Sequence, residues 1–427
     1  MTPRLRFVLF ATCLLAALPL IASEPPGGPV PSAHAIALAH QAIVIDTHAD
    51  TPQWMLDGSY DFTRPGSHRM VSLEKARQGG LKAEFFSIWV EPRFGAQTVE
   101  RALDLIDAVR RQAEAHPAQL GLATSAADVR RLAANHRFAM LMGVEGGHAI
   151  ADDLAVLRDY YRLGVRYMTL TWSNTNDWAD SSGDEHDPRV RHHNGLTPFG
   201  KQVVAEMNRL GMIVDISHVS DKTFWDAIAA TQAPLIASHS SARALVNAPR
   251  NMTDDMLRAV ARNGGVVQVN DYSSFDSQAA RDQAASFAAQ ERREEAPVDA
   301  AWEGDWLHGY PHIDAFQRRF AAAHFQRPPF SALMDQFVHI IKVAGIDHVG
   351  LGSDWDGIDS APQGMDGAQD VPRIVQGLLD RGYTDAQIRQ ILGLNTLRVL
   401  TRVEAVAHRL QRQPDTAFRS NSGPVKP

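Results

Sequence analysis

The sequence predicts an α/β fold, a (β/α)8 TIM barrel, because eight short apolar runs alternate with longer helical patterns. The runs are rich in β-branched residues and almost continuously apolar, which is typical of parallel strands covered by helices. The intervening segments are apolar at three- and four-residue spacing and often end in glycine, as helices do. Eight strand–helix units favour a closed barrel over an open sheet. The runs span residues 42–50, 84–90, 138–147, 165–172, 212–218, 234–240, 265–270 and 348–354.

Five of these runs end in side chains that bind metals or transfer protons. In a (β/α)8 barrel, the carboxyl ends of all strands open onto one face, where active sites are built. We therefore expect these side chains to converge, although each taken alone could be a core histidine, a loop acid or a helix cap. They are His48, Asp50, Glu145, His218, His239 and Asp354.

The first run carries Asp46, His48 and Asp50 at alternate positions, which places all three on the same face of a strand. Three ionisable groups on one buried face are costly unless a cation compensates for their charge. His48 and Asp50 therefore suggest a metal site. Asp46, which lies deeper, is expected either to orient a ligand or to make a buried structural hydrogen bond.

The number of candidate ligands predicts a binuclear centre. A four-coordinate zinc with an open position needs only three protein ligands, whereas five ligands with one bridging carboxylate fit two metals about 3.5–4 Å apart. We assign His48 and Asp50 to one metal, His218 and His239 to the other, and Glu145 to the bridge. Nitrogen and oxygen ligands fit two Zn²⁺ ions, and also admit Mn²⁺, Fe²⁺ or Co²⁺.

Asp354 follows the last predicted strand and is left without a metal to bind. Two cations lower the pKa of a bridging water towards neutrality. Asp354 is then expected to take a proton from this water and to pass it to the departing amine.

The first residues predict export. Residues 1–23 have two arginines, a short apolar core and small residues at the end, as a secretory signal peptide does, and we expect cleavage after Ser23. A retained membrane anchor is the alternative. The chain is then periplasmic or secreted, with no stable membrane anchor. Its formal charge of −7 becomes more negative when the two arginines are removed, which argues against binding to nucleic acid.

The rest of the chain is expected to form a single catalytic domain. Cys13, the only cysteine, lies in the signal peptide, so disulfides and thiolate metal sites are excluded from the mature chain. We predict a Pro/Gly-rich leader at 24–38, the barrel domain at 39–412 and a disordered tail at 413–427. A mainly helical insertion at about 271–330 interrupts the pattern before the last strand.

A series of motifs resembles the membrane (renal) dipeptidase family, peptidase family M19. The resemblance runs from about residue 40 to about 405, and implies a metal-dependent hydrolase of the amidohydrolase superfamily. It implies cleavage of dipeptides by a hydroxide bridging two zinc ions, and it is compatible with a homodimer. The motifs, in order, are IDTHADTP, GVEGGHAI, YMTLTWSNTNDWAD, GLTPFG, MIVDISHVS, SHSSAR, APRNMTDD and DHVGLGSDWDGI.

The family's functional positions fall on residues of this chain. The resemblance assigns the acid–base role to Asp354, and it matches Arg250 in APRN to the arginine that binds the terminal carboxylate of the substrate. A planar guanidinium suits bidentate binding of a carboxylate. Because the carboxylate is what is recognised, D-configured C-terminal residues are expected as substrates too. The five metal positions of the family fall on His48, Asp50, Glu145, His218 and His239.

One substrate-binding position departs from the family pattern. Trp172 stands where the family usually has a histidine that helps to polarise the substrate carbonyl. An indole has one donor and no acceptor, and loss of one such donor costs about 10²–10³-fold in rate. The metal, the indole N–H or a neighbour such as His148 must then stabilise the oxyanion. Trp172 leaves two alternatives open: a hydrolase of another amide or ester, such as an acyl-amino acid or a lactone, or a catalytically weak peptide-binding protein.

Overall fold

The computed structural model describes residues 25–56 and 58–412. The predicted signal peptide and the predicted C-terminal tail lie outside these residues. None of the helices in the described part of the chain has the length and apolar character that crossing a bilayer requires.

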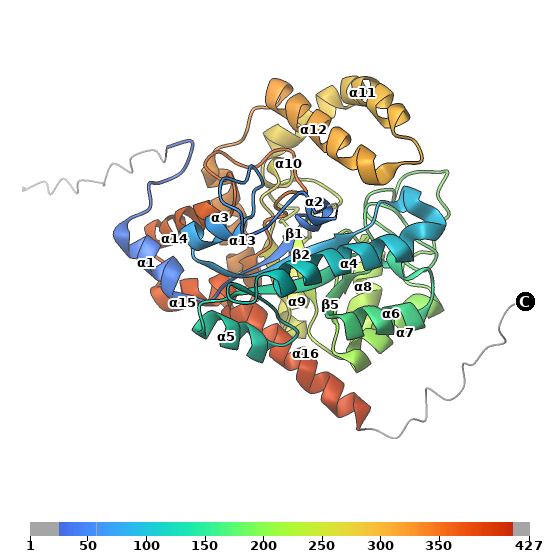
Figure 1. The fold of residues 1–427 in the computed structure, drawn as a ribbon, viewed down its shortest axis with the longest axis horizontal. Coiled ribbons are helices and arrows are strands. Elements are labelled where there is room, and N and C mark those ends of the chain that lie inside the picture. The colour runs from blue at the N-terminus through green and yellow to red at the C-terminus, as the bar shows by residue number, and fades with distance from the viewer. Residues whose placement is uncertain (1–24, 57, 413–427) are drawn as a thin grey trace, which may run out of the picture.

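The predicted (β/α)8 barrel is confirmed (Figure 1). Seven of the eight predicted runs contain a strand, and the run at 84–90 covers most of β2, which begins three residues earlier. All neighbouring strands pair in parallel, in the order β2-β1-β9-β8-β7-β6-β5-β4, and a β2–β4 pairing closes the ring. Their carboxyl ends therefore share one mouth. The strands are β1 (Val44–Ala49), β2 (Leu81–Trp89), β4 (Phe138–Glu145), β5 (Val165–Thr169), β6 (Ile213–Asp215), β7 (Ile236–Ser240), β8 (Val266–Val269) and β9 (Val349–Leu351).

A further short strand, β3 (Leu120–Leu122), lies outside the ring and was not predicted. It pairs with the start of β4, where Leu120 lies opposite Phe138, while β5 joins β4 only from Met142 onward. The three residues LGL are too few to show the alternation from which a strand is recognised.

The helices surround the barrel and are bounded by caps that the sequence supplies. Most begin after a serine or threonine whose hydroxyl accepts a bond from the first turn, such as Ser125 or Thr253, and several end at a left-handed glycine, such as Gly164. They are α1 (Ala33–Gln41), α2 (Pro52–Met55), α3 (Leu73–Gly79), α4 (Thr98–Ala115), α5 (Ala126–Ala134), α6 (Leu154–Leu163), α7 (Pro198–Leu210), α8 (Asp221–Ala230), α9 (Asp254–Asn263), α13 (Phe330–Ala344), α14 (Val371–Asp380), α15 (Asp385–Arg389) and α16 (Asn395–Gln411). Short 3-10 segments η1 (Pro92–Gln97), η2 (Gly147–Ile150), η3 (Ile346–His348) and η4 (Ala368–Asp370) and a π segment η5 (Gln390–Leu394) complete the set.

Helix α1 begins inside the segment expected as a leader. Its residues Ala35 and Leu38 are buried, and the helix packs against α14. The backbone before it is also fixed, because the Phe330 N–H donates to the Pro26 carbonyl at 2.8 Å. The residues that precede β1 are therefore part of the folded domain from at least Pro26 onward.

Alternate strand residues face two cores, as the period of a strand requires. Val44 and Phe86 pack in the core beneath the helices, whereas Ile45, Phe85 and Tyr167 fill the interior of the barrel. Room for Tyr167 depends on a glycine of β4. A Cβ at position 143 would lie 2.0 Å from the Tyr167 Cζ, so only glycine allows the ring to cross the barrel there.

The predicted helical insertion lies between β8 and β9. It contains α10 (Ser273–Asp276), α11 (Gln278–Ala301) and α12 (Trp306–His324). The two long helices pack against each other, and Figure 1 shows them on one side of the barrel, opposite α16.

Candidate metal centre

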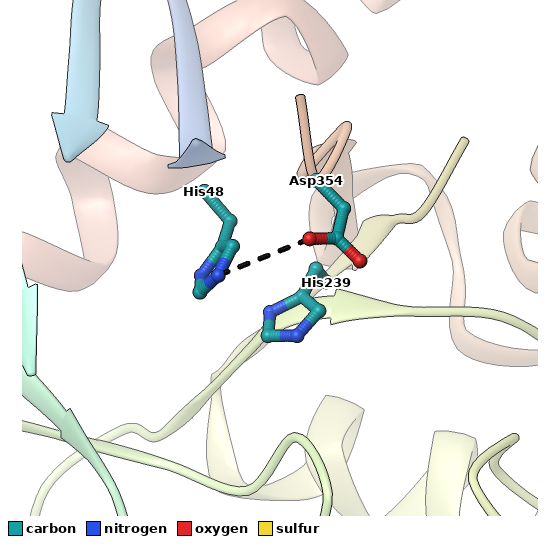
Figure 2. A group of neighbouring side chains, drawn as sticks. All are labelled: His48, His239 and Asp354. Atoms are coloured by element: carbon teal, nitrogen blue, oxygen red, sulfur yellow. Dashed lines mark ion pairs between the residues drawn. The ribbon is translucent and has the colours of Figure 1, made fainter. Parts of the chain in front are cut away.

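The structure brings all six predicted strand-end side chains together at the mouth of the barrel. His48 and His239 lie within strands, Glu145 ends β4, and the others lie in the first residues after β1, β6 and β9. Figure 2 shows His48, His239 and Asp354 pointing toward one another from three separate elements. The side chains form three groups whose possible ligand atoms lie within 4.8 Å of one another: His48 with Asp50 and Glu145, Glu145 with His218 and His239, and His48 with His239 and Asp354.

Glu145 stands between the two predicted metal positions. Its Oε2 lies 3.2 Å from the His48 Nε2, while its Oε1 lies 2.9 Å from the His218 Nε2 and 3.5 Å from the His239 Nε2. Asp50 Oδ2 lies 3.7 Å from the His48 Nε2, on the first side. One carboxylate oxygen thus faces each predicted ligand pair, which is the arrangement that a bridging ligand needs.

Hydroxyl groups determine that Nδ1 carries a proton in two of the histidines. The Tyr167 hydroxyl donates to the Thr47 carbonyl at 3.1 Å and lies 2.9 Å from the His48 Nδ1, so it accepts the Nδ1 proton. In the same way, Ser238 Oγ donates to Asp215 at 2.5 Å and lies 2.8 Å from the His239 Nδ1. In both rings Nδ1 is thus occupied by a hydroxyl oxygen, and Nε2 faces the site, where the neutral ring would offer a lone pair to a metal.

The same assignment leaves polar atoms that a bound cation would satisfy. The Nε2 atoms of His218 and His239 lie 2.9 Å apart, and His218 Nδ1 has Ser173 Oγ at 3.3 Å as its own partner. The buried His48 Nε2 and Asp50 Oδ1 have no hydrogen-bond partner among the described residues. Lone pairs that face one another without a donor repel, so the residues present fit a bound metal.

The charges at the mouth lead to the same requirement. Burial raises the pKa of Asp50 to about 7, and burial also raises the pKa of Asp354. Burial and the charge of Arg250 lower the pKa of His218 to about 4, and burial lowers the pKa of His239 well below its ordinary value. His218 and His239 are therefore neutral at pH 7. His48 differs, because the neighbouring Tyr167, Glu145 and Asp50 raise its pKa well above the ordinary value in spite of its burial. That one proton does not keep Asp50 and Asp354 at their ordinary low pKa values beside Glu145. A divalent cation would supply the missing positive charge.

Asp46 makes buried structural hydrogen bonds, which is one of the two roles expected for it. Its Oδ1 accepts from the His48 N–H at 3.1 Å, and its Oδ2 accepts from the Ser353 N–H and Oγ at 2.9 and 2.6 Å. It therefore ties the end of β1 to the residue before Asp354. Asn270, which the sequence analysis missed, donates to Asp354 Oδ2 at 3.1 Å.

Trp172 lies in the wall of a cavity above the metal centre. The cavity holds about 500 Å³, and its floor includes Asp50, Glu145 and Asp354. The Trp172 ring centroid lies 5.0 Å from that of Trp89 and 6.3 Å from that of the His218 ring. The indole is thus next to the predicted metal ligands.

His148 does not supply the hydrogen-bond donor for which it was considered. Burial lowers its pKa, so the ring is neutral and carries one proton. The Nε2–H donates to the Val90 carbonyl at 2.9 Å, and the buried Nδ1 has no partner. This proton is therefore engaged away from the cavity.

Arg250 lies beside the centre but bonds to the end of β7. It donates to the His239 carbonyl at 2.6 Å and to Ser240 Oγ at 2.8 Å, and its buried Nε has no partner. Burial lowers its pKa to about 10, so it stays charged at pH 7. Unlike Trp172, Arg250 is not among the residues that line the cavity, and the N–H groups that it leaves unbonded are the Nε–H and the remaining Nη hydrogens.

Sequence reasoning missed Tyr167 and Asp215, which orient metal ligands from inside the barrel. Asp215 was detectable, because it stands three residues before His218 at the end of an apolar strand. Tyr167 gives no comparable signal, because an aromatic residue in a strand is most simply read as core.

Replacing Tyr167 with phenylalanine should weaken metal binding about 10–100-fold, because the His48 Nδ1 proton loses its acceptor while the ring still fills the barrel. Competition with a chromophoric chelator measures the affinity. Tyr160→Phe is the control, since Tyr160 is also buried and donates only to the Ala149 carbonyl of η2 at 2.7 Å. Equal affinities of Tyr167→Phe and wild type would contradict this role of Tyr167.

Comparison with known proteins shows the family of the chain. Residues 32–414 match the model of the membrane dipeptidase family, peptidase family M19. The chain is 34% identical over 406 residues to an uncharacterized dipeptidase of Schizosaccharomyces pombe, covering 90% of this chain and 86% of that protein. It is 33% identical over 388 residues to dipeptidase 3 of Homo sapiens, covering 88% and 68%. The structure of the probable dipeptidase PvdM from Pseudomonas aeruginosa matches with a TM-score of 0.74 at 25% identity, covering 88% of this chain and 98% of that one. The chain therefore belongs to the membrane dipeptidase family and is a metallopeptidase.

Proposed function

We propose that the protein is an exported dipeptidase with a binuclear zinc centre. The observation that carries the proposal is the position of Glu145, which directs one oxygen toward His48 and the other toward His218 and His239. Two Zn²⁺ ions held by these residues and Asp50 would polarise the substrate carbonyl and lower the pKa of a water toward neutrality.

Asp354 is the proposed proton carrier. It faces the centre, with its Oδ1 4.0 Å from the His48 Nε2, and the amide of Asn270 fixes its other oxygen. The backbone at Asp354 is in the left-handed region, with φ of 62°, a strained conformation that directs the carboxylate into the mouth. Asp354 takes the proton of the attacking water and gives it to the departing amine.

Arg250 and Trp172 are the proposed substrate contacts. The free N–H groups of Arg250 bind the C-terminal carboxylate, which limits the substrate to one residue after the scissile bond. This contact is to the carboxylate alone and does not depend on the configuration at the Cα of that residue, so D-configured residues are accepted. Trp172 covers the site from the side of His218.

The location of the protein is proposed from its first residues alone. Removal of residues 1–23 leaves a periplasmic or secreted enzyme without a membrane anchor. The mass of the mature chain, recovered from the periplasm or medium, reports whether this segment is cleaved.

Asp354→Asn should lower kcat for dipeptides about 10²–10⁴-fold, because the amide cannot accept a proton. The assay uses zinc-restored protein with L,L and L,D dipeptides, and metal content is measured on the same samples. An unchanged zinc content shows that the loss concerns proton transfer.

If the wild type cleaves acyl-amino acids or lactones but no dipeptide, the proposal is wrong and the alternative hydrolase is correct.

Trp172→His distinguishes a working dipeptidase from a weak peptide-binding relative. We expect kcat/KM for dipeptides to stay within about tenfold of wild type, because the metal supplies the carbonyl polarisation. A gain of about 10²–10³-fold, the value of one oxyanion donor, would instead show that the indole had impaired the site.

A further inference from the structure

Both long helices of the insertion turn one face to the cavity. Helix α12 contributes Tyr310, Ile313 and Gln317, at spacings of three and four residues. Helix α11 contributes Glu291, Glu295 and Asp299, at spacings of four. Residues at these spacings lie on one side of a helix, so the second set forms a continuous acidic stripe on the cavity wall.

The acidic stripe (Glu291, Glu295 and Asp299) is unusual because it faces the cavity and not the solvent. Like charges four residues apart destabilise a helix by a few tenths of a kcal/mol even in water. All three residues are only partly exposed, whereas Glu294 of the same helix is exposed. A helix that only covered the barrel would place apolar or neutral residues on this inner face.

The cavity has fewer cations than acids outside the metal centre: Arg93 and Arg101 against Glu91, Glu291, Glu295, Asp299 and Asp359. Arg101 bonds to the Gln53 side chain at 2.9 Å. Arg93 bonds both oxygens of Asp299 at 2.8 Å and lies 3.2 Å from Glu91. Glu295 accepts a bond from Gln317 at 2.8 Å, but that amide carries no charge. Among the described residues, no ion pair involves Glu291.

Asp359 adds a carboxylate from the loop that follows β9. It lines the same cavity, and its buried Oδ1 has no hydrogen-bond partner among the described residues. Burial raises the pKa of Asp359 to about 7, and the charge of Glu291 adds to this shift. Arg318 is near enough for its charge to lower the pKa of Asp359, but its guanidinium bonds to Asp314 and to the Asp356 carbonyl. Among the described residues, Glu291 and Asp359 therefore face the cavity as two neighbouring acids without an ion pair.

The cavity also has an aromatic wall. The ring centroid of Trp89 lies 5.0 Å from that of Trp172 and 5.7 Å from that of Tyr310. Such a wall packs against the methylene groups of a long side chain and attracts a cation at its end. Acids and aromatic rings in one cavity together select a side chain with an apolar stem and a positive tip.

We propose that the cavity binds dipeptides that contain a residue with a long cationic side chain, namely lysine, ornithine or arginine, and that Glu291 and Asp359 bind its charge. This inference rests on the proposed dipeptidase function, because it names the substrate class of the same site. It assigns the insertion a role in specificity.

Lysine and norleucine differ in their terminal charge, so a comparison between them tests the inference. The substrates are Lys-Ala and Ala-Lys, each matched with its norleucine counterpart, and every one has a free α-amine. For the zinc-restored wild type, we expect kcat/KM to favour lysine over norleucine at least tenfold in one of the two positions. The α-amine cannot cause such a preference, because it is common to all substrates.

The double variant Glu291→Gln/Asp359→Asn should reduce this preference about tenfold. The ratio of the two kcat/KM values is measured within each protein, so differences in the amount of active enzyme cancel. Glu294→Gln is the matched control: it removes the same charge from the exposed side of α11 and should leave the ratio unchanged. Melting temperatures establish that each variant is folded.

The outcomes separate this inference from the proposed function. If no dipeptide is cleaved, the proposed function fails. If Ala-Ala is cleaved but lysine is not preferred over norleucine, or if the double variant retains the full preference, the inference alone is overturned.

Discussion

The burial of three carboxylates beside three imidazoles at the mouth of the barrel is the constraint on which the rest of the site depends. Asp50, Glu145 and Asp354 cannot all be ionised there on the positive charge of His48 alone, and the neutral His218 and His239 direct lone pairs inward. Bound cations resolve both problems at once. The closed parallel barrel brings the ends of strands distant in sequence to one mouth, and so assembles this charge cluster.

The barrel interior positions this charge cluster through hydrogen bonds. Tyr167 and the Ser238–Asp215 pair fix the protons of His48 and His239, and Asp46 ties the end of β1 to the residue before Asp354. These groups lie below the ligands and are themselves buried, so their geometry is set by barrel closure. Stability and chemistry therefore depend on the same few contacts.

Much of the fold and of the metal centre could be predicted, because both give a repeating pattern in the sequence. Each barrel strand is an apolar run, and His48 with Asp50, or Glu145, stands where such a run ends. The contact of Tyr167 with His48 could not be predicted, because it crosses the barrel and depends on where the ring closes. The sequence also could not predict that the acidic stripe faces the cavity, since acidic residues four apart on a helix are most often solvated. The bonding of Arg250 to β7 depends on loop geometry that no motif specifies.

The central claim is that two divalent ions share the Glu145 carboxylate. Anomalous diffraction at the zinc absorption edge, from crystals of protein purified with zinc and without chelator, tests it directly. We expect two peaks, one between Glu145 and the His48–Asp50 pair and one between Glu145 and the His218–His239 pair. A fully ordered mouth with no peak beside Glu145 would contradict it.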